Sequence, residues 1–359
     1  MSAIILDGEV QSALATVRSL GRHALPIVCG SIRKTGLACH STHVVSRFVY
    51  TSPKVNQEKF ILELIKEAEA LFKKDGQKPV LYCFSDATAL TVARNFQLLQ
   101  TYIEMPLPRL EAVEIAADKE KTYELAKELS IPIITLYKES EFGQVQYPCV
   151  IKNRHSIVWR EGRSFFGTAS FVFSHDELIT SYHHLKNETG EAPLVQEFVQ
   201  GDEYGVEMLC DTGKVIASFS HKRIRSLSPR GGAAVVKETA LQTKEVELMQ
   251  KYAAALVNEL SWHGPIMIEF KFDRNTGAMK LMEINGRFWG SLPLAVKAGL
   301  DFPMEYYKLA KHEETQSPIS IELGFMRTRH FLGDCKWVLN VFFKKDSLRK
   351  LMYPSRSRA

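Results

Sequence analysis

Short apolar runs alternate with amphipathic segments over the first 110 or so residues. Apolar runs predict buried strands at 3–6, 26–29 and 80–84. Apolar residues at helical spacing predict helices at 10–20, 57–73 and 87–99. Strands that are apolar on both faces and alternate with helices are typical of a parallel sheet covered on both sides. The first part of the chain is therefore predicted to be a doubly wound α/β domain.

The pattern changes after Pro106 and Pro108. A charged helix is predicted at 118–130, and beyond it short strands outnumber helices. These strands are predicted at 148–152, 169–173, 194–199, 204–209, 214–220, 266–272 and 279–285. Hairpin-like turns at 211–213 and 273–277 indicate antiparallel pairing, so this part is predicted to be α+β.

Length and composition bound the class of protein. A chain of 359 residues predicts two or three packed domains, and 45% hydrophobic with 24% charged residues excludes disorder, collagen and coiled coil. The six cysteines contain no CxxC pair, which speaks against a disulfide framework and a structural zinc site. Asp7 and Glu9 interrupt the apolar start, and no 18 apolar residues run together, so we expect a cytoplasmic protein without a transmembrane segment.

Positive charge is concentrated at the C-terminal end. The chain carries a net charge of +5, but residues 327–359 contain nine basic and two acidic residues, a local balance of +7. The rest of the chain is then slightly acidic, which argues against a nucleic-acid-binding surface across the fold. Apolar residues from Phe331 onward recur near helical spacing, so the tail is predicted to be a basic amphipathic segment.

The most informative segment is the predicted hairpin at 266–287. Side chains alternate along a strand, so Glu269 faces away from Ile268 and Phe270, and Glu283 and Asn285 share one face. Pairing that is symmetric about residue 276 would put Glu269 opposite Glu283. Two carboxylates about 5 Å apart repel by roughly 3–4 kcal/mol, which predicts a cation such as Mg²⁺ between them. Solvated acids on a half-exposed hairpin are the alternative interpretation.

Two lysines and a broken strand add to this pattern. Lys119 opens the charged helix and Lys152 ends an apolar strand, and each ammonium group offers three donors to a phosphate. The strand at 194–199 breaks at Gly201 before it resumes, which exposes backbone groups that are able to read an adenine edge. Taken singly, each feature also fits a surface lysine or a simple turn.

The order of these segments resembles the ATP-grasp superfamily, and most closely its carboxylate-amine ligases, relatives of D-alanine:D-alanine ligase and of the carbamoyl phosphate synthetase large chain. The resemblance rests on the segments Asp118-Lys119, 148–152, 195–203, 267–270 and 282–287, and it covers residues 1–310. It implies a pre-ATP-grasp domain at 1–110, ATP-grasp subdomains at 111–193 and 194–326, and a basic extension at 327–359.

The resemblance also implies roles for individual residues around ATP and Mg²⁺ or Mn²⁺. The phosphates would be held by Lys119 and Lys152, adenine by the backbone of Glu197, Phe198 and Val199, the ribose by Glu203, and the metal by Glu269, Glu283 and Asn285. Arg287 would neutralise the acyl phosphate or the tetrahedral intermediate, with a salt bridge to Glu283 as the alternative. Lys222, Arg223 and Arg230 are second-rank candidates in a basic loop that otherwise is simply solvated.

The implied function is an ATP-dependent ligase that phosphorylates a small carboxylate and joins it to an amine. An ATP-grasp carboxylase, a thiol ligase and a nucleotide-binding module without catalysis are the alternatives. The loop at 153–168 lacks the glycines with which many relatives cover the phosphates, and Arg154, Arg160 and Arg163 are candidates to replace them.

The expected partners are small-molecule substrates and no nucleic acid. The basic tail is expected either to pack on the core or to touch an anionic membrane or acidic polymer. A homodimer is the assembly that the family suggests.

Overall fold

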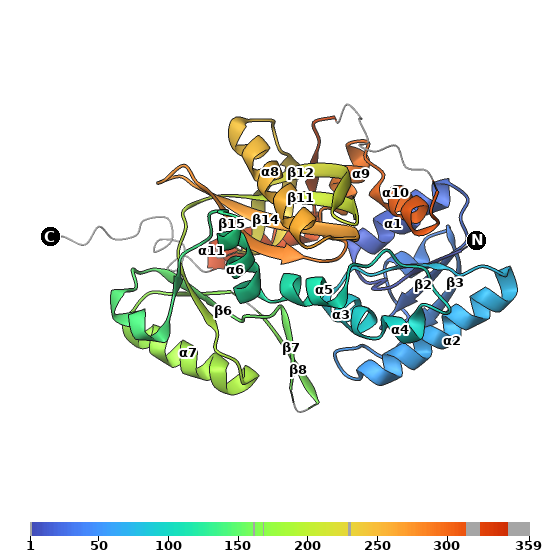
Figure 1. Cartoon of the computed structure of the whole chain (residues 1–359), viewed down its shortest axis with the longest axis horizontal. Helices are drawn as coiled ribbons and strands as arrows, with labels where there is room; N and C mark the ends of the chain where they lie inside the picture. The colour runs from blue at the N-terminus through green and yellow to red at the C-terminus, as the bar shows by residue number, and fades with distance from the viewer. Residues whose placement is uncertain (1, 161, 168, 229–230, 314–323, 344–359) are drawn as a thin grey trace.

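The computed structural model describes the whole chain except residues 1, 161, 168, 229–230, 314–323 and 344–359 (Figure 1). No helix within the described ranges is long and apolar enough to cross a membrane.

The N-terminal part is a four-stranded parallel sheet in the order β3-β2-β1-β4. Its strands are β1 (Ala3–Ile5), β2 (Ile27–Ser31), β3 (Val44–Val49) and β4 (Val80–Tyr82). Helix α1 (Gln11–Arg22) shares a core with one face of the sheet, whereas α2 (Gln57–Asp75) and α3 (Asp86–Arg94) share a core with the other. The parallel pairing predicted for the apolar strands is confirmed. Strand β3 was not predicted, because it is a mostly exposed edge strand without an apolar run.

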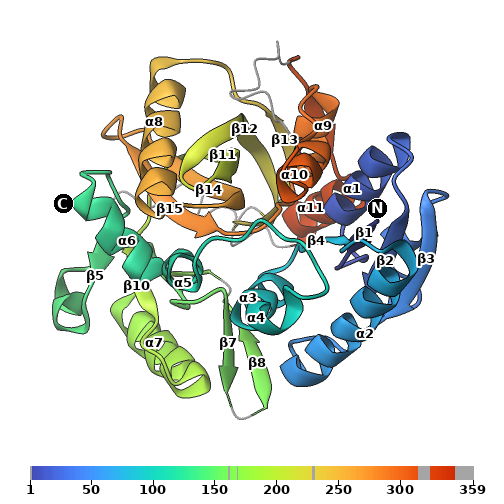
Figure 2. The same cartoon turned by 45° about the vertical axis from the view of Figure 1, so that its right-hand side comes forward.

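A smaller four-stranded sheet follows, in the order β5-β10-β6-β9. Its strands are β5 (Leu136–Tyr137), β6 (Cys149–Lys152), β9 (Ser170–Val172) and β10 (Leu194–Glu197). Helices α4 (Phe96–Leu99), α5 (Leu110–Ala117) and α6 (Lys119–Glu128) lead into it, and α7 (His175–Thr189) packs on it. Strands β7 (Ile157–Arg160) and β8 (Arg163–Phe166) form a separate hairpin that projects from this sheet toward the N-terminal part (Figure 2).

The largest sheet is antiparallel, with six strands in the order β15-β14-β11-β12-β13-β16. Its strands are β11 (Gly201–Asp211), β12 (Lys214–Ser228), β13 (Gly231–Thr239), β14 (Gly264–Asp273), β15 (Met279–Asn285) and β16 (Arg327–Arg329). Helix α8 (Lys244–Glu259) covers one face through a shared apolar core. Helices α9 (Leu292–Lys297), α10 (Phe302–Ala310) and α11 (Phe331–Phe343) complete the described chain.

The first sheet and the end of the chain share one hydrophobic core. Ile5 of β1, Trp289 and Phe302 of α10 are all fully buried members of it. Two hydrogen bonds cross this contact, from Tyr82 to the Pro303 carbonyl and from Tyr306 to the Leu81 carbonyl, each 2.9 Å long. The N-terminal sheet is therefore bonded to α10 and shares one apolar core with α10 and the large sheet.

Candidate active site

Glu269 of β14 and Glu283 of β15 are direct cross-strand partners. The predicted pairing is confirmed, although not by a uniform register. Next to the turn, Lys271 pairs with Lys280, one residue away from symmetry about 276. Met282 is an extra, bulged residue that restores the expected register from Glu269 onward. Its carbonyl accepts a hydrogen bond of 2.6 Å from Tyr123, which ties the bulge to α6.

The two carboxylates are held together in a largely buried position, with Glu269 12% exposed and Glu283 29% exposed. Burial and the neighbouring Glu283 raise the pKa of Glu269 to about 8, even though Arg223 opposes this shift. Burial would also raise the pKa of Glu283, but Lys119, the hydrogen bond with Glu269 and Lys152 lower it to about 2. At neutral pH the two carboxylates therefore share one proton. A cation bound between them would take the place of that proton.

Two buried lysines, on α6 and β6, lie near this pair. Lys119 is the first residue of α6, is 6% exposed, and places Nζ 3.7 Å from Oε2 of Glu283. Lys152 ends β6, is 8% exposed, and contacts the Tyr123 hydroxyl at 3.4 Å. Burial lowers the pKa of Lys152, and the nearby Glu283 and Glu269 carboxylates counteract the effect. Lys119 also donates to Ser156 Oγ at 3.1 Å. Each ammonium group has three donors, so both are still suited to bind an anionic ligand such as phosphate.

Arg223 and Glu203 extend the charged face across the large sheet. Glu203 of β11 is the strand partner of both Arg223 and Lys271. Arg223 lies 2.7 Å from Glu203 and 3.0 Å from Glu269, and Lys271 lies 3.2 Å from Glu203. Glu203 is therefore placed beside the acidic pair, between two cations.

Lys222 is placed differently from its neighbour in sequence. Because side chains alternate along β12, Lys222 faces the opposite side from Arg223. It forms an ion pair of 2.9 Å with Asp202 and lies 5.5 Å from the centre of the Tyr204 ring. The structure thus brings Arg223 to Glu269 but leaves Lys222 on the other face. Arg230 lies outside the described residues.

The segment from Glu197 to Val199 connects β10 of the small sheet with β11 of the large one, so it lies at the junction of the two sheets. The Glu197 amide donates to the Thr135 carbonyl, and its carboxylate contacts Lys280 at 2.6 Å. Phe198 packs edge-on against another ring, and Val199 is buried. Of these three backbone amides, that of Glu197 already donates a hydrogen bond within the protein.

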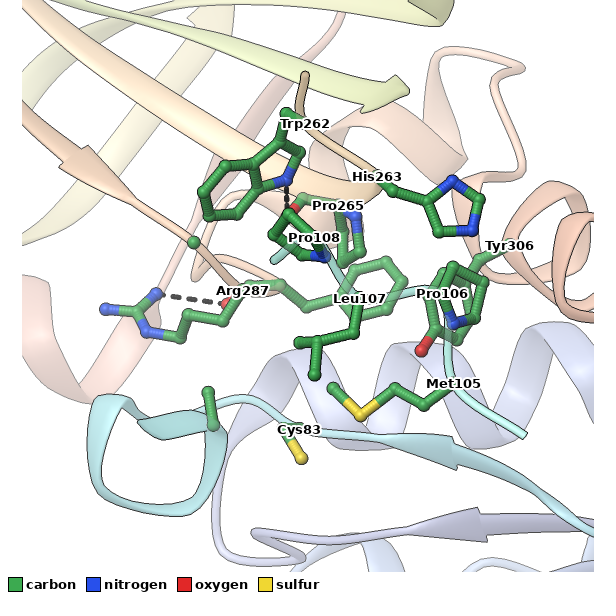
Figure 3. Close-up of a pocket in the computed structure, with 13 residues that line it drawn as sticks. Cys83, Met105, Pro106, Leu107, Pro108, Trp262, His263, Pro265, Arg287 and Tyr306 are labelled. Carbon is green, nitrogen blue, oxygen red and sulfur yellow. Dashed lines mark hydrogen bonds between the residues drawn. The ribbon is translucent and has the colours of Figure 1, made fainter. Parts of the chain in front are cut away.

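Arg287 reaches a partner that the sequence analysis did not identify. Its guanidinium donates two hydrogen bonds to Asp86 at the start of α3, 2.9 and 3.1 Å long, and one of 3.1 Å to Asn285 Oδ1. Arg287 is thus paired with Asp86 and not, as the alternative interpretation had it, with Glu283. The backbone of Arg287 borders a cavity of about 10 Å³ near Leu107 and Tyr306, while its guanidinium points away from it (Figure 3). That cavity is large enough for one water molecule at most.

The loop at 153–168 contains the β7–β8 hairpin, and two of its arginines, Arg154 and Arg160, have protein partners. Arg154 forms ion pairs with Asp118 and Glu120, and Arg160 donates to the Asn187 carbonyl at 3.0 Å. The Trp159 indole donates to the Pro53 carbonyl at 3.1 Å, so the hairpin is attached to the N-terminal part.

The donor set at the acidic pair fits a hard divalent cation. Within the described residues, no three His, Cys, Asp or Glu side chains converge on one point. Protein ligands for a cation would therefore be the carboxylates of Glu269 and Glu283 and the amide oxygen of Asn285. Oxygen-only ligation that leaves positions for water and phosphate is what Mg²⁺ prefers.

Comparison with known proteins places this site in context. Residues 189–329 match the model of a family described as ATP-grasp in the biosynthetic pathway with Ter operon. The carbamoyl phosphate synthase large chain of Clostridium acetobutylicum is 21% identical over 236 residues, which are 63% of this chain and 21% of that one. The chain thus spans about a fifth of the length of the curated relatives that it matches.

Solved structures match over most of the chain. The biotin carboxylase domain of 2-oxoglutarate carboxylase from Hydrogenobacter thermophilus, solved with MgADP, ADP and bicarbonate, has a TM-score of 0.69 at 17% identity, over 91% of this chain and 74% of that one. An L-amino acid ligase from Bacillus licheniformis has a TM-score of 0.66 at 14% identity, over 90% and 77%. Together with the family match, these likenesses show the predicted ATP-grasp fold.

Proposed function

We propose that this chain, which has the ATP-grasp fold and matches an ATP-grasp family model over residues 189–329, is an ATP- and Mg²⁺-dependent carboxylate-amine ligase. The observation that carries the proposal is the convergence of the paired carboxylates Glu269 and Glu283 with the buried ammonium groups of Lys119 and Lys152. The groups come from two subdomains, and together they offer a cation site beside a phosphate site.

The charge of each side chain indicates its proposed role. Lys119 and Lys152 bind phosphate oxygens, Phe198 and Val199 meet adenine with their backbone, and Glu203 is in reach of the ribose. Glu269, Glu283 and Asn285 hold Mg²⁺, which neutralises the phosphates during transfer. Arg223 and Arg287 flank the acidic pair and stabilise negative charge on the reacting carboxylate.

The proposed reaction has two steps. A carboxylate oxygen bonds to the γ-phosphorus of ATP while the bond to the bridging oxygen breaks, which releases ADP. An amine then attacks the acyl carbon and loses a proton, and phosphate leaves. The protein contributes mainly positioning and charge neutralisation.

A carboxylase is the second candidate, and the likeness to biotin carboxylase domains is the observation that favours it. Bicarbonate would take the place of the organic acid and would be phosphorylated by ATP at the same site in the first step. The two functions therefore differ in which carboxylate is phosphorylated.

The test is a screen of the full chain with ATP and Mg²⁺ for release of ADP and phosphate. Amino acids and other small carboxylates are supplied singly and in pairs with amines, and bicarbonate is supplied separately. Oxygen-labelled carboxylate should pass one labelled atom to phosphate. Turnover with bicarbonate alone supports the carboxylase, whereas release of AMP, or no turnover with any acid, contradicts both proposals.

A further inference from the structure

Two cysteine sulfurs of the N-terminal part are in contact. Sγ of Cys39 lies 3.2 Å from Sγ of Cys29, although the residues are ten positions apart in the sequence. Cys29 belongs to β2, and Cys39 belongs to the short helix η1 (Ala38–His40). Both are free thiols and both are buried, with exposed fractions of 0% for Cys29 and 5% for Cys39. Because a disulfide bond is about 2.05 Å long, a movement of about 1 Å would bring the sulfurs to bonding distance.

The backbone of Gly8, in the turn after β1, keeps the two thiols together. Its amide donates a hydrogen bond of 3.0 Å to the Gly30 carbonyl of β2, and its carbonyl accepts one of 2.7 Å from the Ala38 amide of η1. A Cβ atom at Gly8 would lie 2.9 Å from Sγ of Cys39 and 3.1 Å from Sγ of Cys29. Only glycine therefore leaves the pair its room, and the fold holds η1 and β2 at a fixed separation.

The surroundings of the pair favour a thiolate at Cys39. The hydrogen bond with Cys29 lowers the pKa of Cys39, because the neighbouring thiol stabilises negative charge on its sulfur. Ser31 and Arg47 act in the same direction, whereas burial and Glu9 oppose the shift. The pKa of Cys29 is raised instead, by the same hydrogen bond and by burial. Since the thiolate is the reactive form of cysteine, Cys39 is expected to react first.

A small oxidant is able to reach Cys39 from the surface. Cys39 lines a cavity of about 280 Å³ together with residues 40–41 and 44–47. Val45, in the wall of this cavity, is 68% exposed, so the cavity opens to solvent. Its volume is several times the roughly 30 Å³ that one water molecule takes up in the liquid, so a small peroxide fits.

We propose that Cys29 and Cys39 form an oxidation site, which peroxides convert reversibly into a disulfide. The Cys39 thiolate attacks one oxygen of hydrogen peroxide and the O–O bond breaks, which gives a sulfenic acid and hydroxide. The Cys29 sulfur then attacks the sulfenic sulfur, the S–S bond forms, and water leaves with the thiol proton. The two sulfurs lose two electrons, and the peroxide takes them up. This chemistry uses no residue of the proposed ligase site.

The test is peptide mapping of the full chain after treatment with hydrogen peroxide. The remaining thiols are blocked with N-ethylmaleimide before digestion. Trypsin cuts after Arg33 and Lys34, so the two cysteines fall on separate peptides, residues 23–33 and 35–47. A disulfide joins these peptides with the loss of two hydrogen atoms, and dithiothreitol separates them again. Cys29→Ala removes the partner of Cys39, and Cys335→Ala, at a half-buried position on α11, is the matched control.

We expect the joined peptides in the wild type and in Cys335→Ala. Cys29→Ala should lack them, and its Cys39 should be oxidised further to the sulfinic acid. Because the fold keeps the sulfurs in contact, the link should form about tenfold faster or more in the folded protein than in the chain unfolded in urea. Failure of the folded wild type to form the link, whether or not other cysteines are oxidised, overturns the proposal. A link to a different cysteine, or a rate in urea that equals the folded rate, overturns it as well.

Discussion

At the residue scale, the acidic pair is surrounded by cations from several elements of the fold. Glu269 and Glu283 are direct strand partners, and the cations around them come from α6, β6 and β12. The alternation of side chains predicted which face these acids share. It did not predict which of Lys222 and Arg223 reaches them, because the register of β12 against its neighbours is not a local property.

Replacement of Glu283 by Gln keeps the size of the side chain but removes the charge that would bind Mg²⁺. We expect turnover to fall by about two orders of magnitude or more while the melting temperature stays close to that of the wild type. Initial rates over a Mg²⁺ titration and thermal unfolding measure the two effects. Glu259→Gln, on the exposed end of α8, is the control. Near-wild-type activity at limiting Mg²⁺ would show that the metal site is misassigned.

The raised pKa of Glu269 makes stability depend on pH when no metal is present. The folded pKa of about 8 lies above the ordinary value of 4.5, so the folded state binds the extra proton between these two values. The free energy of unfolding should therefore decrease as pH rises through this window, by on the order of 5 kcal/mol. Urea unfolding in EDTA at several pH values measures this, and Glu269→Gln should show a shallower decrease. Equal slopes for both proteins would contradict the prediction.

At the element scale, the end of β15 is fixed by the start of α3. Asp86 belongs to the first turn of that helix, after the N-cap Ser85, and receives two hydrogen bonds from Arg287. The predicted strands at 266–272 and 279–285 are confirmed, whereas the bulge at Met282 was not predicted. A bulge is decided by how the two strands fit their neighbours, here the contact with Tyr123, and not by the composition of the hairpin.

Asp86 acts in this view as a positioning residue for Arg287. We expect Asp86→Asn to lower kcat by about tenfold and to leave the KM for ATP nearly unchanged, because the guanidinium loses its orienting charge. Steady-state kinetics with ATP varied separates the two constants. The control is Glu114→Gln, whose ion pair with Arg94 is 3.7 Å long and about half exposed. A change in KM alone, or equal effects of both variants, would count against positioning.

At the scale of the whole molecule, the N-terminal sheet and the C-terminal helices are parts of one core. Across it Tyr82 donates a hydrogen bond to the Pro303 carbonyl and Tyr306 donates one to the Leu81 carbonyl, and Trp289 is packed within it. Residues from opposite ends of the chain therefore depend on each other for their burial. Periodicity along the sequence predicted the two kinds of sheet but contained no signal for this contact.

The shared core predicts coupled unfolding. Ile5→Ala removes buried apolar volume from β1 and should cost about 2–5 kcal/mol. Tryptophan fluorescence should show the shift in the urea midpoint, because all four tryptophans (Trp159, Trp262, Trp289 and Trp337) follow the N-terminal sheet in the chain. The control Val45→Ala is 68% exposed on β3 and should stay within about 0.5 kcal/mol of the wild type. A tryptophan signal that does not shift with Ile5→Ala would indicate that the two parts unfold independently.

The sequence by itself determined the periodic elements, the ATP-grasp resemblance and the facing of Glu269 and Glu283, because strand and helix periods act between residues close in the chain. The tertiary structure decided the ionic partners. Asp86 and Arg287 are 201 positions apart, and Lys119 and Glu283 are 164 apart. An ion pair depends on distance in space, which follows from how the sheets and helices pack and not from local pattern.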